Sequence, residues 1–216
     1  MRHVSGLAEL IRILILQGEL APGVLLDEPV LAERFMTARP TLREALRLLE
    51  GRGLLHANGS GGMRVVALDS EGLAELLEVR AVLEAMCAAE AAERSRRDRL
   101  PARAAEHLLE LADAVDIATA AGRADRALFA DRTFHLAFSG LAGNRAGHVA
   151  LDHLWDRIVV AQRGSTASAP GTAVATREHR VLVACVSDGD AEEASGTARR
   201  HALSALRDLT SPVAPS

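Results

Sequence analysis

The stretch ARPTLREALRLLEGRGLL, residues 38–55, repeats arginine every four residues, at Arg39, Arg43 and Arg47. At about 100° per residue, these arginines lie within about 80° of one another on a helix. Leucine and alanine side chains fill the opposite side. A solvated amphipathic helix has this pattern, and so does a DNA recognition helix, which packs its apolar side on supporting helices and turns its polar side to phosphates and base edges.

The start of this helix is open to two interpretations. Pro40 suits the first turn of a helix, where its missing N–H is not needed. Thr41 and Glu44 have the spacing of a capping box. If the helix begins at Thr41, Arg39 belongs to the preceding turn.

The segments on either side favour the DNA-binding interpretation. Apolar periodicity and capping signals predict helices over 4–16 and 27–35. Short strand-like runs at 54–56 and 64–67 flank ANGSGGM, which has the dipeptides of a hairpin turn. Three helices followed by a hairpin predict a winged helix-turn-helix domain over residues 1–68, in which Arg64 and the backbone of Gly61 and Gly62 can approach phosphate.

No strand signal recurs after residue 69. Helices are predicted at 70–98, 101–120, 124–141, 145–162, 173–187 and 190–208. We therefore expect a mainly α protein, with the winged helix-turn-helix domain followed by an all-helical bundle over 69–216.

Composition limits the classes of function. The chain of 216 residues has a net charge of −4 and no lysine. Residues 1–66 contain eight arginines and seven acidic residues, a net charge of +1, so a DNA-binding claim depends on where individual arginines point. Neither a signal peptide nor a run of about 18 uncharged apolar residues is found, which predicts a cytoplasmic protein without a membrane partner. Cys87 and Cys185 are expected to be small buried apolar residues.

The N-terminal motifs carry a family resemblance. GELAPGVLLDEPVLAERFMTARPTLREALRLLEGRGLL, followed by GSGGMRVV, resembles the DNA-binding domain of the GntR family of bacterial transcription regulators. The chain departs from the family pattern at Ala38, usually serine, and at Pro40–Thr41, usually in reverse order. The resemblance implies DNA contacts by Arg34, Arg39, Arg43 and the wing glycines Gly61 and Gly62. The full candidate set also contains Thr41, Arg47 and Arg64.

A second group of residues suggests metal chemistry. Asp131 and His135 are four residues apart on one predicted helix face, and His179 and His201 lie on two further predicted helices. One carboxylate and three imidazoles suit Zn²⁺, Ni²⁺ or Mn²⁺. No local spacing signature links all four, and an Asp–His pair at this spacing is more often an exposed helix pair.

The second half of the chain also resembles a known domain. LLEVRAVLE, DRTFHLAFSGLAGN, EHRVLVACVSDGD and RRHAL are similar to landmarks of the FCD effector-binding domain of the FadR subgroup of GntR regulators. The resemblance implies that Asp131, His135, His179 and His201 bind a divalent metal, with Zn²⁺ the first expectation. His107, His148 and His153 match no role.

Arg80 and Asn144 are the candidate effector contacts. Arg80 matches a family arginine that reaches into the effector pocket, and its guanidinium suits a carboxylate. The alternative is an ion pair with Glu84, four residues on. Asn144 alternatively caps the following helix.

Together these features predict a regulator, expected to be a repressor, that binds a pseudo-palindromic operator as a homodimer and responds to a small organic acid over the metal. An enzyme is not expected. The rival readings are a metal-dependent hydrolase with Glu178 as base, and a regulator whose metal is purely structural.

Overall fold

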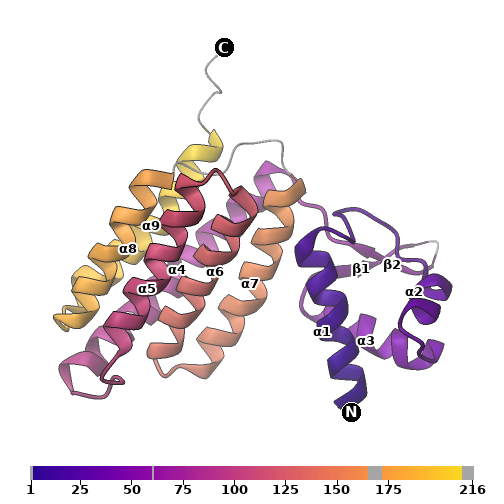
Figure 1. Ribbon diagram of the computed structural model, residues 1–216, viewed down its shortest axis with the longest axis horizontal. Coiled ribbons are helices and arrows are strands. Elements are labelled where there is room, and N and C mark those ends of the chain that lie inside the picture. Colours follow the sequence, from indigo (N-terminus) through magenta and orange to yellow (C-terminus); the bar gives the residue numbers. More distant parts are fainter. Residues whose placement is uncertain (1, 60, 165–171, 211–216) are drawn as a thin grey trace. The chain divides into compact units, whose positions relative to one another are not determined.

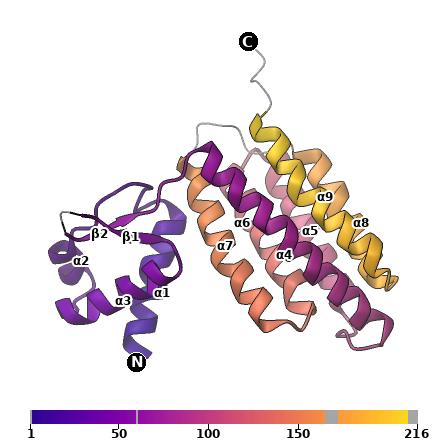
Figure 2. The ribbon, with the colours of Figure 1, turned by 180° about the vertical axis from the view of Figure 1, so that it is seen from behind.

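The computed structural model describes residues 2–59, 61–164 and 172–210 of a mainly α protein (Figures 1 and 2). The described residues form two compact units. The N-terminal unit comprises residues up to 73 together with 156–164, and the helical unit comprises 74–155 and 172–210. The division falls at 73/74 and at 155/156, each time inside a helix. The domain boundary at 68/69 stays a prediction.

The N-terminal unit has the expected winged helix-turn-helix elements. Three helices precede a two-stranded antiparallel sheet: α1 (Arg2–Gln17), α2 (Glu28–Arg34), α3 (Arg39–Gly51), β1 (Leu55–Ala57) and β2 (Met63–Val65). His56 pairs with Arg64 at the centre of the hairpin. The ends of the two strands lie within two residues of the predicted runs. The remaining difference arises because the pairing register of a hairpin sets the strand ends, and a run of apolar residues does not fix that register.

Local chemistry explains where α2 and α3 begin. The side chain of Asp27 accepts a hydrogen bond from the N–H of Val30, as expected for an N-cap. Helix α3 begins at Arg39, with Ala38 as an N-cap that makes no side-chain hydrogen bond. The start at Thr41 is therefore wrong, because Pro40 is accommodated in the first turn of α3.

The apolar side of α3 supplies the core of the N-terminal unit. Its Leu42, Ala45, Leu46 and Leu49 are buried against α1 and β1. Leu48, which the helical angles placed on the apolar side, is instead 47% exposed because it lies at the edge of that face. Burial of this face leaves the arginine side of α3 exposed to solvent.

The helical unit is a bundle of long helices whose axes are roughly aligned (Figures 1 and 2). Its helices are α4 (Ser70–Arg96), α5 (Ala104–Ala120), α6 (Ala124–Leu141), α7 (Arg145–Gly164), α8 (Thr172–Ser187) and α9 (Ala191–Thr210). Residues 70–73 of α4 and 156–164 of α7 belong to the N-terminal unit. Helix α5 packs on α6 and α8, and α8 packs on α9. Buried alanines such as Ala88, Ala91 and Ala198 let the helices approach closely around Phe134 and Phe138. The prediction of a helical second half is confirmed.

Two smaller expectations also have outcomes. Cys87 is buried and Cys185 is half-buried, and both are free thiols. Among the described residues, no helix is long and apolar enough to cross a membrane.

Candidate metal centre and nucleic-acid interface

Three helices bring the four predicted metal ligands together. Asp131 and His135 lie on α6, His179 on α8 and His201 on α9. The Nε2 atom of His135 lies 3.1 Å from that of His201 and 3.3 Å from that of His179, and His179 and His201 are 3.2 Å apart at the same atoms. The Asp131 carboxylate lies 3.2 Å from Nε2 of His179. Residues that are up to 70 positions apart in sequence therefore share one point.

The donor set fits a divalent cation. Bonds of about 2.0–2.1 Å from a tetrahedral metal to nitrogen space the ligand atoms about 3.3 Å apart, close to the distances between the three Nε2 atoms. Three neutral imidazoles cannot all hydrogen-bond to one another through Nε2, because each ring carries one proton. A cation at their common point satisfies all three lone pairs. The three histidines are buried, and the side chain of Asp131 is 24% exposed.

Two glutamates lie behind the histidine rings. Oε1 of the buried Glu84 on α4 lies 3.1 Å from Nδ1 of His135, and Glu178 on α8 lies 2.9 Å from Nδ1 of His201. A carboxylate at Nδ1 holds an imidazole in one orientation and presents Nε2 to a metal. Among the described residues, neither Nδ1 of His135 nor Nδ1 of His179 forms a hydrogen bond, so the contact of Glu84 with His135 is electrostatic.

Electrostatics keep most of these ligands in the form that binds a metal. Burial, together with the charge of the neighbouring histidines, lowers the pKa of His201 to about 4. Burial also lowers the pKa of His179. Burial raises the pKa of Asp131, but His135 and His179 outweigh it and hold that pKa well below its usual value. At neutral pH, the two imidazoles are thus neutral and the carboxylate is charged, as metal ligands must be.

His135 and Glu84 behave differently. Burial lowers the pKa of His135, but the charges of Glu84 and Asp131 outweigh burial and raise that pKa overall. Burial raises the pKa of Glu84, yet Arg80 and His135 outweigh it, so the net direction is down. Glu84 is therefore a buried carboxylate that stays ionised because Arg80 and His135 face it.

Arg80 combines the two interpretations that its sequence position allowed. Its Nε donates to Glu84 at 2.9 Å, which is the expected ion pair, and both side chains are buried. Its Nη2 lies 2.8 Å from Nε2 of His135, at the ligand cluster. Its guanidinium carbon stands 4.2 Å above the ring of Trp155. One arginine thus pairs with a buried acid and points a terminal amino group at the candidate metal centre.

Asn144 and Glu178 make contacts that differ from the ligand-binding and catalytic roles considered for them. The side-chain oxygen of Asn144 accepts from the N–H of Gly147 in the first turn of α7, and its amide donates to Glu90. These contacts favour the capping interpretation. Glu178 faces Nδ1 of His201, on the side of the ring opposite Nε2. A carboxylate behind the ring is placed to orient a ligand, which removes support from the hydrolase reading.

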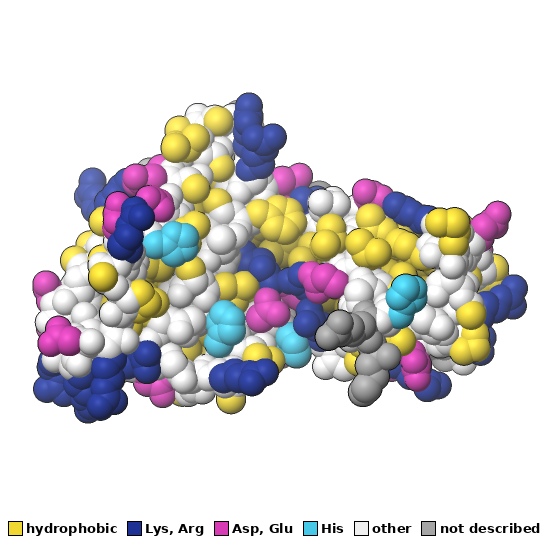
Figure 3. All heavy atoms as spheres, turned by 60° about the horizontal axis from the view of Figure 1, so that its bottom comes forward, with side chains coloured by type: hydrophobic (Ala, Val, Ile, Leu, Met, Phe, Trp, Pro, Cys, Tyr) yellow, Lys and Arg dark blue, Asp and Glu magenta, His cyan; other side chains and the backbone are white. Residues whose placement is uncertain are grey.

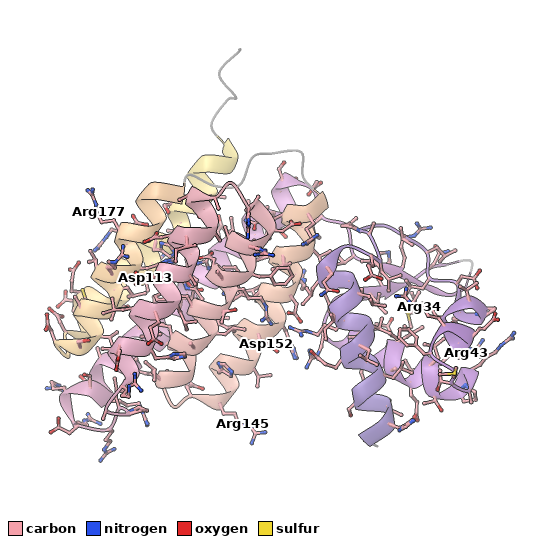
Figure 4. The ribbon with its side chains drawn as sticks, in the orientation of Figure 1. Arg34, Arg43, Asp113, Arg145, Asp152 and Arg177 are labelled. Atoms are coloured by element: carbon pink, nitrogen blue, oxygen red, sulfur yellow. The ribbon has the colours of Figure 1, made fainter. Side chains whose placement is uncertain are left out.

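The second candidate site is the arginine side of the helix-turn-helix. Arg34 on α2 and Arg39, Arg43 and Arg47 on α3 are exposed, and Thr41 is half-buried. Arg34 donates to Glu19 at 2.9 Å, and Nε of Arg43 donates to Glu28 at 2.7 Å. Figure 4 labels Arg34 and Arg43 among the side chains of this unit.

The wing lies beside this arginine side. Gly61 and Gly62 have φ values of 99° and 83°, which favour glycine, and both residues are exposed. Gly62 lines two hollows together with Glu28 and Arg43, of about 480 and 270 Å³. Arg64 instead donates through Nη1 to the carbonyl of Gly23, so its guanidinium is tied to the loop before α2.

The surface carries no uniform basic field on the face drawn in Figure 3. Arginine side chains stand in small groups with acidic side chains between them. This agrees with the small net charge of residues 1–66. A role in DNA binding therefore depends on specific arginines at the helix-turn-helix.

Two buried residues with polar contacts, Trp155 and Asp156, were not predicted from the sequence. Trp155 stacks on His135, with ring centroids 5.2 Å apart, and its Nε1 donates to Glu84 at 3.1 Å. Asp156 accepts two hydrogen bonds from Arg12. The available signals were a single tryptophan in a chain with 2% aromatic residues, and a charged residue within the apolar α1.

Comparison with protein families places both halves of the chain. Residues 4–65 match the family described as bacterial regulatory proteins, gntR family, and residues 75–204 match the FCD domain. The second match alone covers more than half of the chain, and it contains all four candidate metal ligands.

Individual relatives are more distant. An uncharacterized HTH-type transcriptional regulator, YdhC of Bacillus subtilis (strain 168), is 37% identical over 71 residues, which are 33% of this chain and 32% of that protein. The match thus spans about a third of that relative's length. Two solved structures share the fold at a TM-score of 0.79. One is a GntR regulator from Rhodococcus sp. RHA1, 20% identical, covering 97% of this chain and 98% of its own. The other is E. coli McbR/YncC, 21% identical, covering 96% of both chains.

Proposed function

The chain belongs to the GntR family of bacterial regulatory proteins and carries an FCD domain, and from this premise we propose that its affinity for DNA is controlled by a small carboxylate bound at a divalent metal. The observation that carries this proposal is the meeting of Asp131, His135, His179 and His201 within 4.8 Å. The metal, with Zn²⁺ as the first candidate and Ni²⁺ or Mn²⁺ as alternatives, supplies a Lewis-acidic position for a carboxylate.

Arg80 supports an anionic effector. Its guanidinium is held by Glu84 and Trp155, so it is oriented before any ligand arrives. A second cationic group beside the metal favours a carboxylate over a neutral metabolite. Four protein ligands already fill a tetrahedral shell, so a carboxylate joins the metal only when the coordination number rises. An ion that accepts six ligands, such as Ni²⁺ or Mn²⁺, accommodates this more easily.

The DNA-binding part of the proposal rests on the exposed arginines of α2 and α3. A homodimer would place two such surfaces on a pseudo-palindromic operator. We propose repression, in which the carboxylate lowers operator affinity. The coupling free energy is expected to be about 1–3 kcal/mol, about 5- to 150-fold in affinity.

Fluorescence anisotropy tests the proposal directly. The purified chain is titrated onto the duplex upstream of its own gene and onto a scrambled duplex, at two salt concentrations, and then against a panel of small carboxylates. The proposal is supported if the chain prefers the upstream duplex and a carboxylate weakens this binding only when metal is loaded. If removal of metal lowers the melting temperature while no carboxylate changes DNA binding, the metal is structural instead.

A further inference from the structure

An acidic side chain lies on the face that the proposed function assigns to DNA. Glu28 is the first residue of α2, where Asp27 caps the helix and Pro29 follows, so its backbone position is fixed. Its side chain is 16% exposed, and it accepts from Nε of Arg43 at 2.7 Å. A carboxylate here repels phosphate, so its presence on this face calls for a compensating role.

The geometry of the pair suggests that role. Arg43 is bound through Nε, the inner nitrogen of the guanidinium, and its side chain is 63% exposed. Within the described residues, the two terminal amino groups of Arg43 have no protein partner in the structure. Arg34 differs, since it donates to Glu19 through the terminal Nη2, so one of its two terminal amino groups is already occupied.

The terminal amino groups of Arg43 lie beside two hollows in the surface. Glu28, Arg43 and Gly62 line both hollows beside the wing, the larger of which is about 480 Å³. The hollow lies against α3, the element that enters the major groove in proteins of this architecture. Arginine reads guanine by donating two parallel hydrogen bonds to O6 and N7.

We infer that Glu28 is a specificity-determining residue, which holds Arg43 by Nε so that both terminal amino groups face a guanine in the major groove. The inference rests on the proposed DNA binding. A held guanidinium loses less rotamer freedom on binding its base, and the neighbouring carboxylate disfavours the alternative in which Arg43 turns to a phosphate. Glu28 therefore acts through Arg43 and gains base selectivity at some cost in non-specific affinity.

The test uses the full chain and needs no prior operator. Duplexes selected from a random library by the wild-type chain define the preferred site, and single-base variants of that site are titrated by anisotropy at two salt concentrations. The variants are Glu28→Gln, Arg43→Lys and the double variant. Glu33→Gln is the matched control, because it removes the same charge from the exposed side of the same helix. Circular dichroism confirms that each variant folds.

The expected result is a loss of base preference at one position. Arg43→Lys and Glu28→Gln should each lose at least about tenfold of discrimination at the same G·C pair. Glu28→Gln should bind scrambled DNA at least as tightly as the wild type, and Glu33→Gln should keep the preference. In the double variant, Glu28→Gln should add no further loss.

Two results overturn the inference while leaving DNA binding intact. One is full discrimination in Glu28→Gln. The other is a further loss in the double variant at a different position, which would mean that Glu28 reads a cytosine amino group itself. A wild-type chain that binds all duplexes alike contradicts the proposed function, and the inference falls with it.

Discussion

Arg12 of α1 forms a two-point ion pair with Asp156 of α7, 144 residues away, with both N···O distances at 2.6 Å. The Asp156 side chain is fully buried and that of Arg12 is 10% exposed. Bidentate geometry is the arrangement in which a buried arginine and carboxylate best compensate each other's lost hydration. Residues 156–164 belong to the N-terminal unit, so this pair lies within that unit and holds these residues against α1.

Removing Arg12 should destabilise the N-terminal unit strongly. Arg12→Ala removes the bidentate partner of the buried Asp156 carboxylate, at an expected cost of about 3–5 kcal/mol in unfolding free energy. Denaturant unfolding, followed by circular dichroism, measures this cost. Arg34→Ala is the control, since its exposed pair with Glu19 is expected to contribute less than about 1 kcal/mol. A loss below 1 kcal/mol for Arg12→Ala would mean that Arg52, 3.8 Å from Asp156, takes over.

His179→Ala should abolish metal binding. His179 is completely buried, and its Nε2 atom lies within 3.3 Å of the ligand atoms of the three other residues in the cluster. Elemental analysis after dialysis should show about one metal ion per wild-type chain and near-background metal in the variant. His107→Ala, on the exposed side of α5, should keep its metal. A full metal complement in His179→Ala would contradict the four-ligand site.

Glu178→Gln tests the residue behind the ligand. The four ligands remain, but the carboxylate at Nδ1 of His201 becomes an amide that holds the ring less firmly. Metal affinity, measured by competition with a chelating dye, should fall about 10- to 100-fold. Glu193→Gln on α9, whose partner Arg200 is exposed, should bind metal like the wild type. Equal affinity in all three proteins would limit Glu178 to a structural role.

Much of this architecture could be predicted from local sequence. The helices followed from apolar periodicity, and the N-cap at Asp27 followed from residue type, because both depend on neighbours along the chain. The approach of His179 and His201 to Asp131 depends on how three helices pack, so spacing alone left it open, and resemblance to the FCD domain supplied it. The contacts of Trp155 and Asp156 could not be predicted, because a buried polar contact between distant helices leaves no periodic signal. The pair of Glu28 with Arg43 could not be predicted either, because it depends on how α2 and α3 pack.

Arg39→Ala should weaken DNA binding in a way that depends on salt. Arg39 is exposed at the start of α3, and an arginine there that contacts phosphate releases about one counterion on binding. The slope of log affinity against log salt should therefore decrease by about 1, with affinity reduced similarly on preferred and scrambled duplexes. Arg145→Ala, which removes an exposed arginine from α7 (Figure 4), should leave the slope unchanged. An unchanged slope for Arg39→Ala would remove Arg39 from the phosphate contacts.

Arg80 and Glu84 can be separated by a pair of variants. Arg80→Met leaves the Glu84 carboxylate buried without its strongest partner, and the unfolding free energy should fall by about 3–5 kcal/mol. Adding Glu84→Gln removes that charge, so the double variant should recover most of the stability. If Arg80 serves only the ion pair, the metal-loaded double variant should bind carboxylates like the wild type.

We expect the opposite for carboxylate binding. The terminal amino group of Arg80 lies beside Nε2 of His135, and no substitution of Glu84 replaces that positive charge. Calorimetric titration of the metal-loaded double variant should therefore show carboxylate affinity at least about tenfold weaker than that of the wild type, despite restored stability. Arg80→Lys keeps the charge but not the fork, and should fall between the two, because a single ammonium cannot hold Glu84 and an effector carboxylate with the same geometry.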